Sequence, residues 1–232
     1  MKANQIAAVA KTIAFAVVAG AVALGVAAPT NAASEVMYGD PVAAGMYWHQ
    51  QQYDDCVLMS SADVIGQIAG AAPSEAAIIE KAHATPSVVH AGPIYTKPAD
   101  PDNPDSGAGA SVEDVPALLA QYRVAAVVVD RDHTAVRGIR PGIAGLKQAL
   151  GGGHKVIISV NAELIWHEPV DEKDQSGNPL SDHAVVVTGV DATHGIVHLN
   201  DSGISGGRDE QVPMELFVKA WDTSDELMVV TL

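Results

Sequence analysis

The chain has 232 residues, of which 48% are apolar and 18% are charged, and its 28 Asp and Glu against 13 Lys and Arg give a formal net charge of −15. This length and composition exclude intrinsic disorder and indicate one globular domain with a sizeable core. The acidic balance argues against nucleic acid as a partner, because binding to phosphates depends on clustered Lys and Arg.

The first 32 residues have the features of a secretory signal peptide. Lys2 and Lys11 are the only charges in this segment, and an apolar run from Thr12 to Ala28 follows them. Pro29 and small residues come next, so we expect cleavage after Ala32, a mature domain of residues 33–232, and a secreted or cell-envelope location with no membrane association. A retained membrane anchor is the alternative, because the run is only slightly shorter than the roughly 20 residues of a spanning helix.

Cys56 is the only cysteine in the chain. Exported proteins reside where thiols oxidise, and a single cysteine cannot form an intramolecular disulfide. It is therefore a buried apolar residue, an intermolecular link, or a thiol kept for its reactivity.

The residues around Cys56 predict a helix. Apolar residues from Val57 to Ala69 share one helical face, Asp54 or Asp55 can serve as the N-cap, and Gly70 is a natural end. Cys56 then lies at a helix N-terminus, where the macrodipole and the unsatisfied N–H groups favour the nucleophilic thiolate.

The remaining pattern predicts an α+β domain, with helices mostly first, strands mostly last, and a cleft between the two parts. A capping box from Ser111 to Asp114 is expected to begin one of the helices. A tight turn at residues 191–194 is expected to join two strands as a hairpin. The expected helices are 75–83, 112–121 and 139–150, and the expected strands are 124–129, 154–160, 184–190, 195–199 and 227–231.

Among nine histidines, His183 is the best candidate for a catalytic base. It opens an apolar strand, and Asp201 follows the next strand of the predicted hairpin. Antiparallel neighbours bring these two positions alongside each other. A thiol nucleophile needs a base and the base needs an orienting group, so Cys56, His183 and Asp201 together could form a catalytic triad.

These motifs, in this order, resemble a papain-like cysteine peptidase of the thirty-ninth, or C39, family. The resemblance rests on three stretches: Gln50 to Cys56 before an apolar helix, His183-Ala-Val-Val-Val-Thr-Gly189, and Leu199-Asn-Asp201-Ser-Gly203. It covers nearly all of residues 45–232. The chain departs from the family at Val57, where the family has Gly after its cysteine.

The resemblance implies a papain-like fold and an exported thiol peptidase that acts on peptides or proteins without a cofactor. It implies Cys56, His183 and Asp201 as the triad and Gln50 as an oxyanion-hole residue, with Gln51 as the near alternative. Two other functions stay open: a non-catalytic binding or envelope-interaction module, and an acyl transferase that uses the same triad. The oligomeric state also stays open.

Other catalytic and metal motifs fail on their context. The Gly-x-Ser-x-Gly match at residues 203–207 is not followed by a helix start or by a later histidine, as an α/β-hydrolase requires. His194 and His198 lack an evident third zinc ligand, and Pro104 interrupts the partial calcium loop at residues 100–105.

Two acidic segments predict a preference for basic substrates. Residues 167–181 precede His183, and residues 100–105 form the other segment. Negative charge beside a cleft raises the local concentration of cationic peptides.

Overall fold

The computed structural model describes residues 36–100, 106–132 and 137–232. The predicted signal peptide and its cleavage site lie outside these residues, as do positions 101–105 of the partial calcium loop. Residues Glu35–Leu232 form one compact unit. Within the described part of the chain, no helix has the length and apolarity that crossing a membrane requires.

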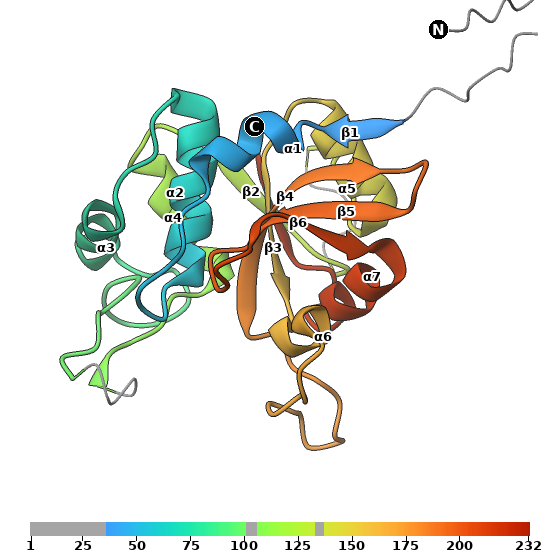
Figure 1. Ribbon diagram of the computed structural model, residues 1–232. Coiled ribbons are helices and arrows are strands. Elements are labelled where there is room, and N and C mark those ends of the chain that lie inside the picture. The colour runs from blue at the N-terminus through green and yellow to red at the C-terminus, as the bar shows by residue number, and fades with distance from the viewer. Residues whose placement is uncertain (1–35, 101–105, 133–136) are drawn as a thin grey trace, which may run out of the picture. The chain divides into compact units, whose positions relative to one another are not determined.

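A seven-stranded antiparallel sheet forms the centre of this unit (Figure 1). Six strands follow the order β2-β7-β3-β4-β5-β6, and β1 pairs with one end of β4. The strands are β1 Met37–Gly39, β2 Ala126–Val129, β3 Val156–Val160, β4 His183–Asp191, β5 Ile196–Asn200, β6 Arg208–Pro213 and β7 Met228–Thr231.

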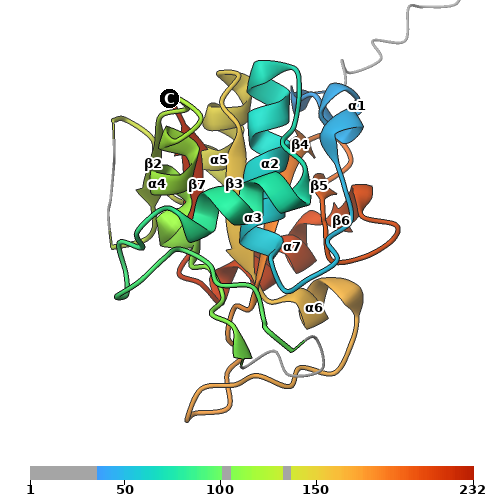
Figure 2. The same cartoon turned by 90° about the vertical axis from the view of Figure 1, so that its left-hand side faces the viewer.

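Helices cover both faces of the sheet, as the two views in Figures 1 and 2 show. One face packs against α2 Cys56–Ala69, α3 Glu75–His83 and α4 Val115–Ala120. The other face packs against α5 Gly142–Gly151, α6 Ala162–Trp166 and α7 Met214–Asp222. Two short segments, α1 Pro41–Ala44 and the 3-10 turn Gly45–Tyr47, precede α2.

Strand β4 contributes to both hydrophobic cores because its side chains alternate between the two faces. Ala184 and Val186 belong to the core under α2, whereas Val185 and Val187 belong to the core under α7. A strand that is buried on both faces has a continuous apolar sequence rather than an alternating one. This explains the unbroken apolar run from Ala184 to Val187 that follows His183.

The mixed helix and antiparallel sheet architecture predicted from the sequence is confirmed, as are most of the elements. Helix α2 begins at Cys56 and ends before Gly70, whose φ of +79° is the left-handed conformation that glycine favours at a helix end. Helix α3 and its Ser74 cap agree with the prediction, and β4 and β5 form the predicted hairpin. Turn 203–207 leads into β6 and not into a helix, so the Gly-x-Ser-x-Gly match is not a nucleophile elbow.

Two expectations about the elements were wrong. The segment expected as helix 112–121 is a 3-10 turn, Val112–Asp114, followed by the short α4. Ser111 makes no side-chain capping bond, and Asp114 instead accepts hydrogen bonds from Ser87 Oγ and Val88 N. The division into helices first and strands last is also less strict than expected, because α6 and α7 alternate with the C-terminal strands.

Candidate active site

Cys56 is the first residue of α2 and lines a cavity of about 300 Å³. Only 8% of the residue is exposed. Cys56 therefore lies in the first turn of a helix, where backbone N–H groups have no partner within the helix. Cys56 is thus buried but also lines a cavity. A cysteine that only filled space in the core would not need to line one.

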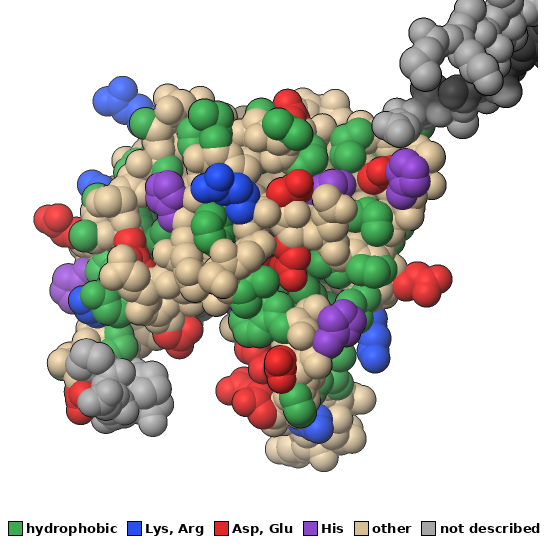
Figure 3. Space-filling view, in the orientation of Figure 1, with side chains coloured by type: hydrophobic (Ala, Val, Ile, Leu, Met, Phe, Trp, Pro, Cys, Tyr) green, Lys and Arg blue, Asp and Glu red, His purple; other side chains and the backbone are tan. Residues whose placement is uncertain are grey.

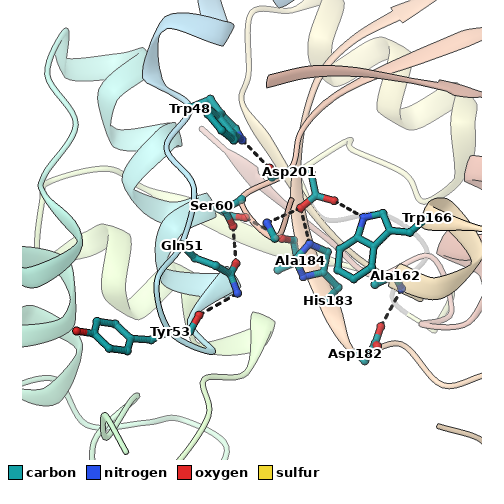
Figure 4. A network of polar contacts seen from close by, with 12 residues as sticks. Trp48, Gln51, Tyr53, Ser60, Ala162, Trp166, Asp182, His183, Ala184 and Asp201 are labelled. Atoms are coloured by element: carbon teal, nitrogen blue, oxygen red, sulfur yellow. Dashed lines mark hydrogen bonds and ion pairs between the residues drawn. The ribbon is translucent and has the colours of Figure 1, made fainter. Parts of the chain in front are cut away.

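His183 is the first residue of β4 and lines the same cavity. Its Nε2 atom lies 2.7 Å from Asp201 Oδ1, and its ring packs against Trp166 with 5.2 Å between ring centroids (Figure 4). The β4–β5 register pairs Val186 with Asn200, which brings the start of β4 alongside the residue that follows β5. The structure therefore places His183 and Asp201 together.

Asp201 is fully buried, and several hydrogen-bond donors stabilise its negative charge. Trp166 Nε1 donates to its Oδ2 atom at 2.9 Å, and Gly203 N donates to its Oδ1 atom at 2.7 Å. Burial opposes the charged form, but the hydrogen bond and charge of His183, with these donors, lower the pKa of Asp201 below its usual value. The carboxylate can therefore orient and stabilise the His183 ring.

His183 pairs with Asp201 and lines the same cavity as Cys56. Because Asp201 engages Nε2, Nδ1 is the ring nitrogen that remains for the thiol. Burial alone would lower the pKa of His183, but the hydrogen bond to Asp201 and the interaction with Cys56 outweigh it and raise the pKa to about 10. The protonated ring is thus favoured at neutral pH.

The structure does not bring Gln50 to the cavity. Gln50 is exposed, and neither it nor Gln51 is among the described residues that line the cavity. Gln51 is held near Asp201: its backbone N–H donates to the Ser202 carbonyl at 2.9 Å, and its Oε1 atom accepts from Ser202 Oγ at 2.8 Å. Its Nε2 atom donates to the Tyr53 carbonyl at 3.0 Å (Figure 4).

Three residues at the site were not identified from the sequence. Trp166 donates to the Asp201 carboxylate, and Trp48 Nε1 donates to the Asp201 backbone carbonyl. Ser60 Oγ donates to the carbonyl of Ala184, the residue after His183, at 3.0 Å. The tryptophans are two of only three in the chain, which is the one signal that could have drawn attention to them.

Within the described residues, no group of three or more His, Cys, Asp or Glu is arranged to hold a metal ion. The two histidines considered for zinc are each paired with a carboxylate. His194 Nδ1 lies 2.6 Å from Asp191, and His198 Nδ1 lies 2.7 Å from Asp209.

A solved structure from Bacillus anthracis shares this fold. It is described as a "putative C39-like peptidase", and it matches with a TM-score of 0.56 and 20% identity over 85% of this chain and 98% of that chain. At this low identity the match shows the fold alone. The chain therefore has the mixed α and antiparallel β fold of that C39-like protein.

No family model matches the chain. Curated relatives include "Uncharacterized protein Rv1268c" of Mycobacterium tuberculosis (strain H37Rv) and "Uncharacterized protein Mb1299c" of Mycobacterium bovis, each 62% identical over 231 residues and covering 100% of both chains. At this identity and coverage, the chain belongs to the same protein family as these mycobacterial proteins.

Proposed function

We propose that the protein is a thiol peptidase that hydrolyses peptide bonds through Cys56, His183 and Asp201. The observation that carries this proposal is that His183, paired with Asp201 at 2.7 Å, lines the same cavity as Cys56 at the start of α2. A nucleophile, a base and a group that orients the base are the parts that covalent acyl transfer requires. The fold shared with a C39-like protein supports the same reaction class.

In the proposed reaction, the Cys56 thiolate attacks the peptide carbonyl carbon while His183 carries the thiol proton. The C–N bond then breaks, and His183 gives this proton to the leaving amine. Water attacks the resulting thioester, His183 accepts a proton from it, and the carboxylate product leaves as the thiol is restored. Asp201 keeps the ring oriented and remains ionised throughout.

The negative charge on the carbonyl oxygen in the transition state needs hydrogen-bond donors. We assign the backbone N–H of Cys56 as one donor, because it is at the start of α2. The second donor is the side-chain amide of Gln50 or of Gln51. Gln50 stands six residues before Cys56, and Gln51 is already fixed to the segment that carries Asp201.

We also propose that the enzyme is exported and that residues 1–32 are removed. N-terminal sequencing of the protein from the culture medium or cell envelope should begin at Ala33. Recovery of intact Met1 in the membrane fraction would indicate the retained anchor instead.

The peptidase proposal is tested by iodoacetamide labelling and peptide hydrolysis on residues 33–232. Labelling of Cys56 should persist at about pH 5–6, where an ordinary thiol with a pKa of about 8.5 reacts slowly. Hydrolysis should be lost in Cys56→Ala, and the labelling profile should move to higher pH in His183→Ala.

His194→Ala is the matched control, because His194 is also paired with an aspartate but lies at the surface. It should leave both the labelling and the hydrolysis unchanged. Labelling that begins only near pH 8.5 and ignores His183 would refute the peptidase and leave a binding module with this fold. Formation of a new amide with an added amine, in preference to hydrolysis, would indicate an acyl transferase.

A further inference from the structure

The cavity that contains Cys56 and His183 has an acidic wall. Four of its lining residues carry a carboxyl group, whereas none of the described lining residues is Lys or Arg. The four carboxyl groups come from separate parts of the chain: the loop before α2, the 3-10 turn before α4, and the loop before β4. They are Asp54, Asp55, Glu113 and Asp182.

Asp55 is the unusual member of this set. It is only 2% exposed, and neither of its carboxylate oxygens has a hydrogen-bond partner in the described structure. The hydroxyl of Tyr95 is also buried without a partner, so it does not satisfy Asp55. Buried carboxylates are almost always paired, because removing an unpaired charge from water is costly. An unpaired one that lines a cavity is a position where a ligand could supply the partner.

The surroundings of Asp55 are also unfavourable to its charge. Burial, together with the negative charges of Glu75 and Asp54, raises the pKa of Asp55 to about 7. The positive charge of Lys97 lowers the pKa of Asp55 only in part. The Lys97 ammonium group contacts the Tyr53 ring, whose centre is 3.8 Å away. A cation in the cavity would therefore stabilise the charged form of Asp55.

The cavity also has an apolar wall, which suits a particular kind of cation. Lys and Arg side chains combine a long apolar stem with a charged end, and they bury the stem against apolar surface. The apolar lining residues can contact such a stem while the carboxyl groups contact the charged end. These apolar residues are Val57, Ala110, Val112, Ala184 and Leu227.

We propose that this cavity is a subsite for a Lys or Arg side chain of the substrate, with Asp55 as the residue that determines specificity. The inference rests on the proposed peptidase function. Because Cys56 and His183 line the same cavity, the basic residue would lie next to the scissile bond or within a residue or two of it. The volume of about 300 Å³ is at the lower end of ligand pockets, as a site for one side chain requires.

The surface outside the cavity fits the same substrate. The loop between α6 and β4 carries Glu168, Asp171, Glu172 and Asp174 and leads directly to Asp182. Figure 3 shows acidic side chains on this projecting loop, on the side that faces a hollow in the surface. Negative potential along the approach would attract a cationic peptide at low salt.

The experiment compares peptides that carry Lys, norleucine or Glu at one position, moved in turn through the three residues on each side of the scissile bond. Norleucine keeps the apolar stem of Lys and lacks the charge. At one position the wild type should cleave the Lys peptide with a kcat/KM about tenfold or more above the norleucine peptide, and the Glu peptide should be the poorest. Asp55→Asn should reduce the Lys-to-norleucine ratio towards one.

Glu215→Gln is the control for total charge, because Glu215 lies on α7 beside a different cavity. It should keep the wild-type ratio. The exposed Glu113→Gln removes an acidic group of the wall without altering a buried position, and it should lower the ratio by a smaller factor. An active wild type with no preference for Lys, or a ratio that Asp55→Asn leaves unchanged, would overturn the subsite.

A second measurement separates this inference from the peptidase proposal. The Cys56→Ala protein is titrated with the same Lys and norleucine peptides, and binding is followed by calorimetry. If the wild type cleaves no peptide, the peptidase proposal fails, but tighter binding of the Lys peptide that Asp55→Asn abolishes would still support the cationic subsite. Equal binding of the two peptides would overturn it.

Discussion

Ser60 on α2 donates a hydrogen bond of 3.0 Å to the carbonyl of Ala184 on β4. Ser60 lies one helical turn after Cys56, and Ala184 directly follows His183. Both partners are buried. The bond therefore fixes the helix that carries the proposed nucleophile against the strand that carries its base.

Ser60→Ala should weaken catalysis and stability together. It leaves the Ala184 carbonyl buried without this donor, which should lower the free energy of unfolding by about 1–3 kcal/mol. It should also lower kcat more than it changes KM, because the distance between Cys56 and His183 is less well fixed. Urea denaturation and steady-state kinetics measure the two effects.

Ser61→Ala is the matched control for that prediction. Ser61 is also buried on α2, but its hydroxyl bonds to the Val57 carbonyl within the same helix at 2.8 Å. Its loss should cost less stability and leave kcat unchanged. An equal fall of kcat in both variants would contradict a positioning role for Ser60.

The choice between Gln50 and Gln51 as the oxyanion donor can be made by substitution. Removing an oxyanion-hole donor typically lowers kcat by about 10²–10³ with little effect on KM. Gln50→Ala should show this effect if the exposed amide turns towards the cavity with substrate. If Gln51 is the donor, Gln51→Ala should show it, and Gln50→Ala should change kcat by less than about threefold.

Trp166→Phe should shift the pH dependence of the reaction. Phe keeps an aromatic ring beside His183 but removes the N–H that donates to the Asp201 carboxylate. Because that donor helps to lower the pKa of Asp201, its loss should raise this pKa. We expect the acidic limb of the kcat/KM profile to move to higher pH and kcat/KM to fall about tenfold, as loss of a hydrogen bond to a charged group implies.

Trp48→Phe is the comparison for Trp166→Phe. Trp48 donates to the backbone carbonyl of Asp201, which does not titrate. Its substitution should leave the acidic limb in place. A shift of the same size in both variants would show that the change comes from loosened packing and not from the lost carboxylate bond.

The raised pKa of Asp55 predicts a pH-dependent stability. Its folded-state pKa of about 7 lies above the ordinary value near 3.9, so the folded state binds an extra proton between these values. The stability of the wild type relative to Asp55→Asn should therefore fall as pH rises from about 4 to 7, by at most about 1.4 kcal/mol per pH unit. Glu75, Asp54, Lys97 and Tyr95 are the other titratable groups that act on Asp55 or sense it.

Denaturation with urea at pH 5 and pH 8 measures this difference, and Glu215→Gln provides the reference for a surface acid. The Lys peptide bound to Cys56→Ala should reduce the difference, because a cation next to Asp55 lowers the cost of charging it. If the free energies of unfolding of wild type and Asp55→Asn differ by the same amount at both pH values, Asp55 is not a buried carboxyl group without a compensating partner.

The elements that carry the site could be predicted from local sequence signals. Cys56 follows two aspartates, which favour a helix start, and precedes an apolar helical face. His183 opens an apolar run that forms a strand buried on both sides. The hairpin turn then places Asp201 next to His183, because the turn and the register set which residues of antiparallel strands lie side by side.

The supporting contacts could not be predicted in this way. Ser60 and Ala184 are 124 residues apart in the sequence, and Trp166 and Asp201 are 35 apart. No local pattern encodes which donor reaches which carbonyl across the packed layers. The unpaired state of Asp55 is likewise a property of packing, since its sequence position suggests a helix cap, whereas its side chain makes no capping bond.

The alternation of β4 between two cores has a consequence for when the site forms. Cys56 belongs to the helical layer on one face of the sheet, whereas Trp166 donates to Asp201 from the layer on the other face. A folding intermediate with only one layer docked would lack either the nucleophile or the support of its acid. The proposed activity would therefore appear only after both helical layers have packed against the sheet.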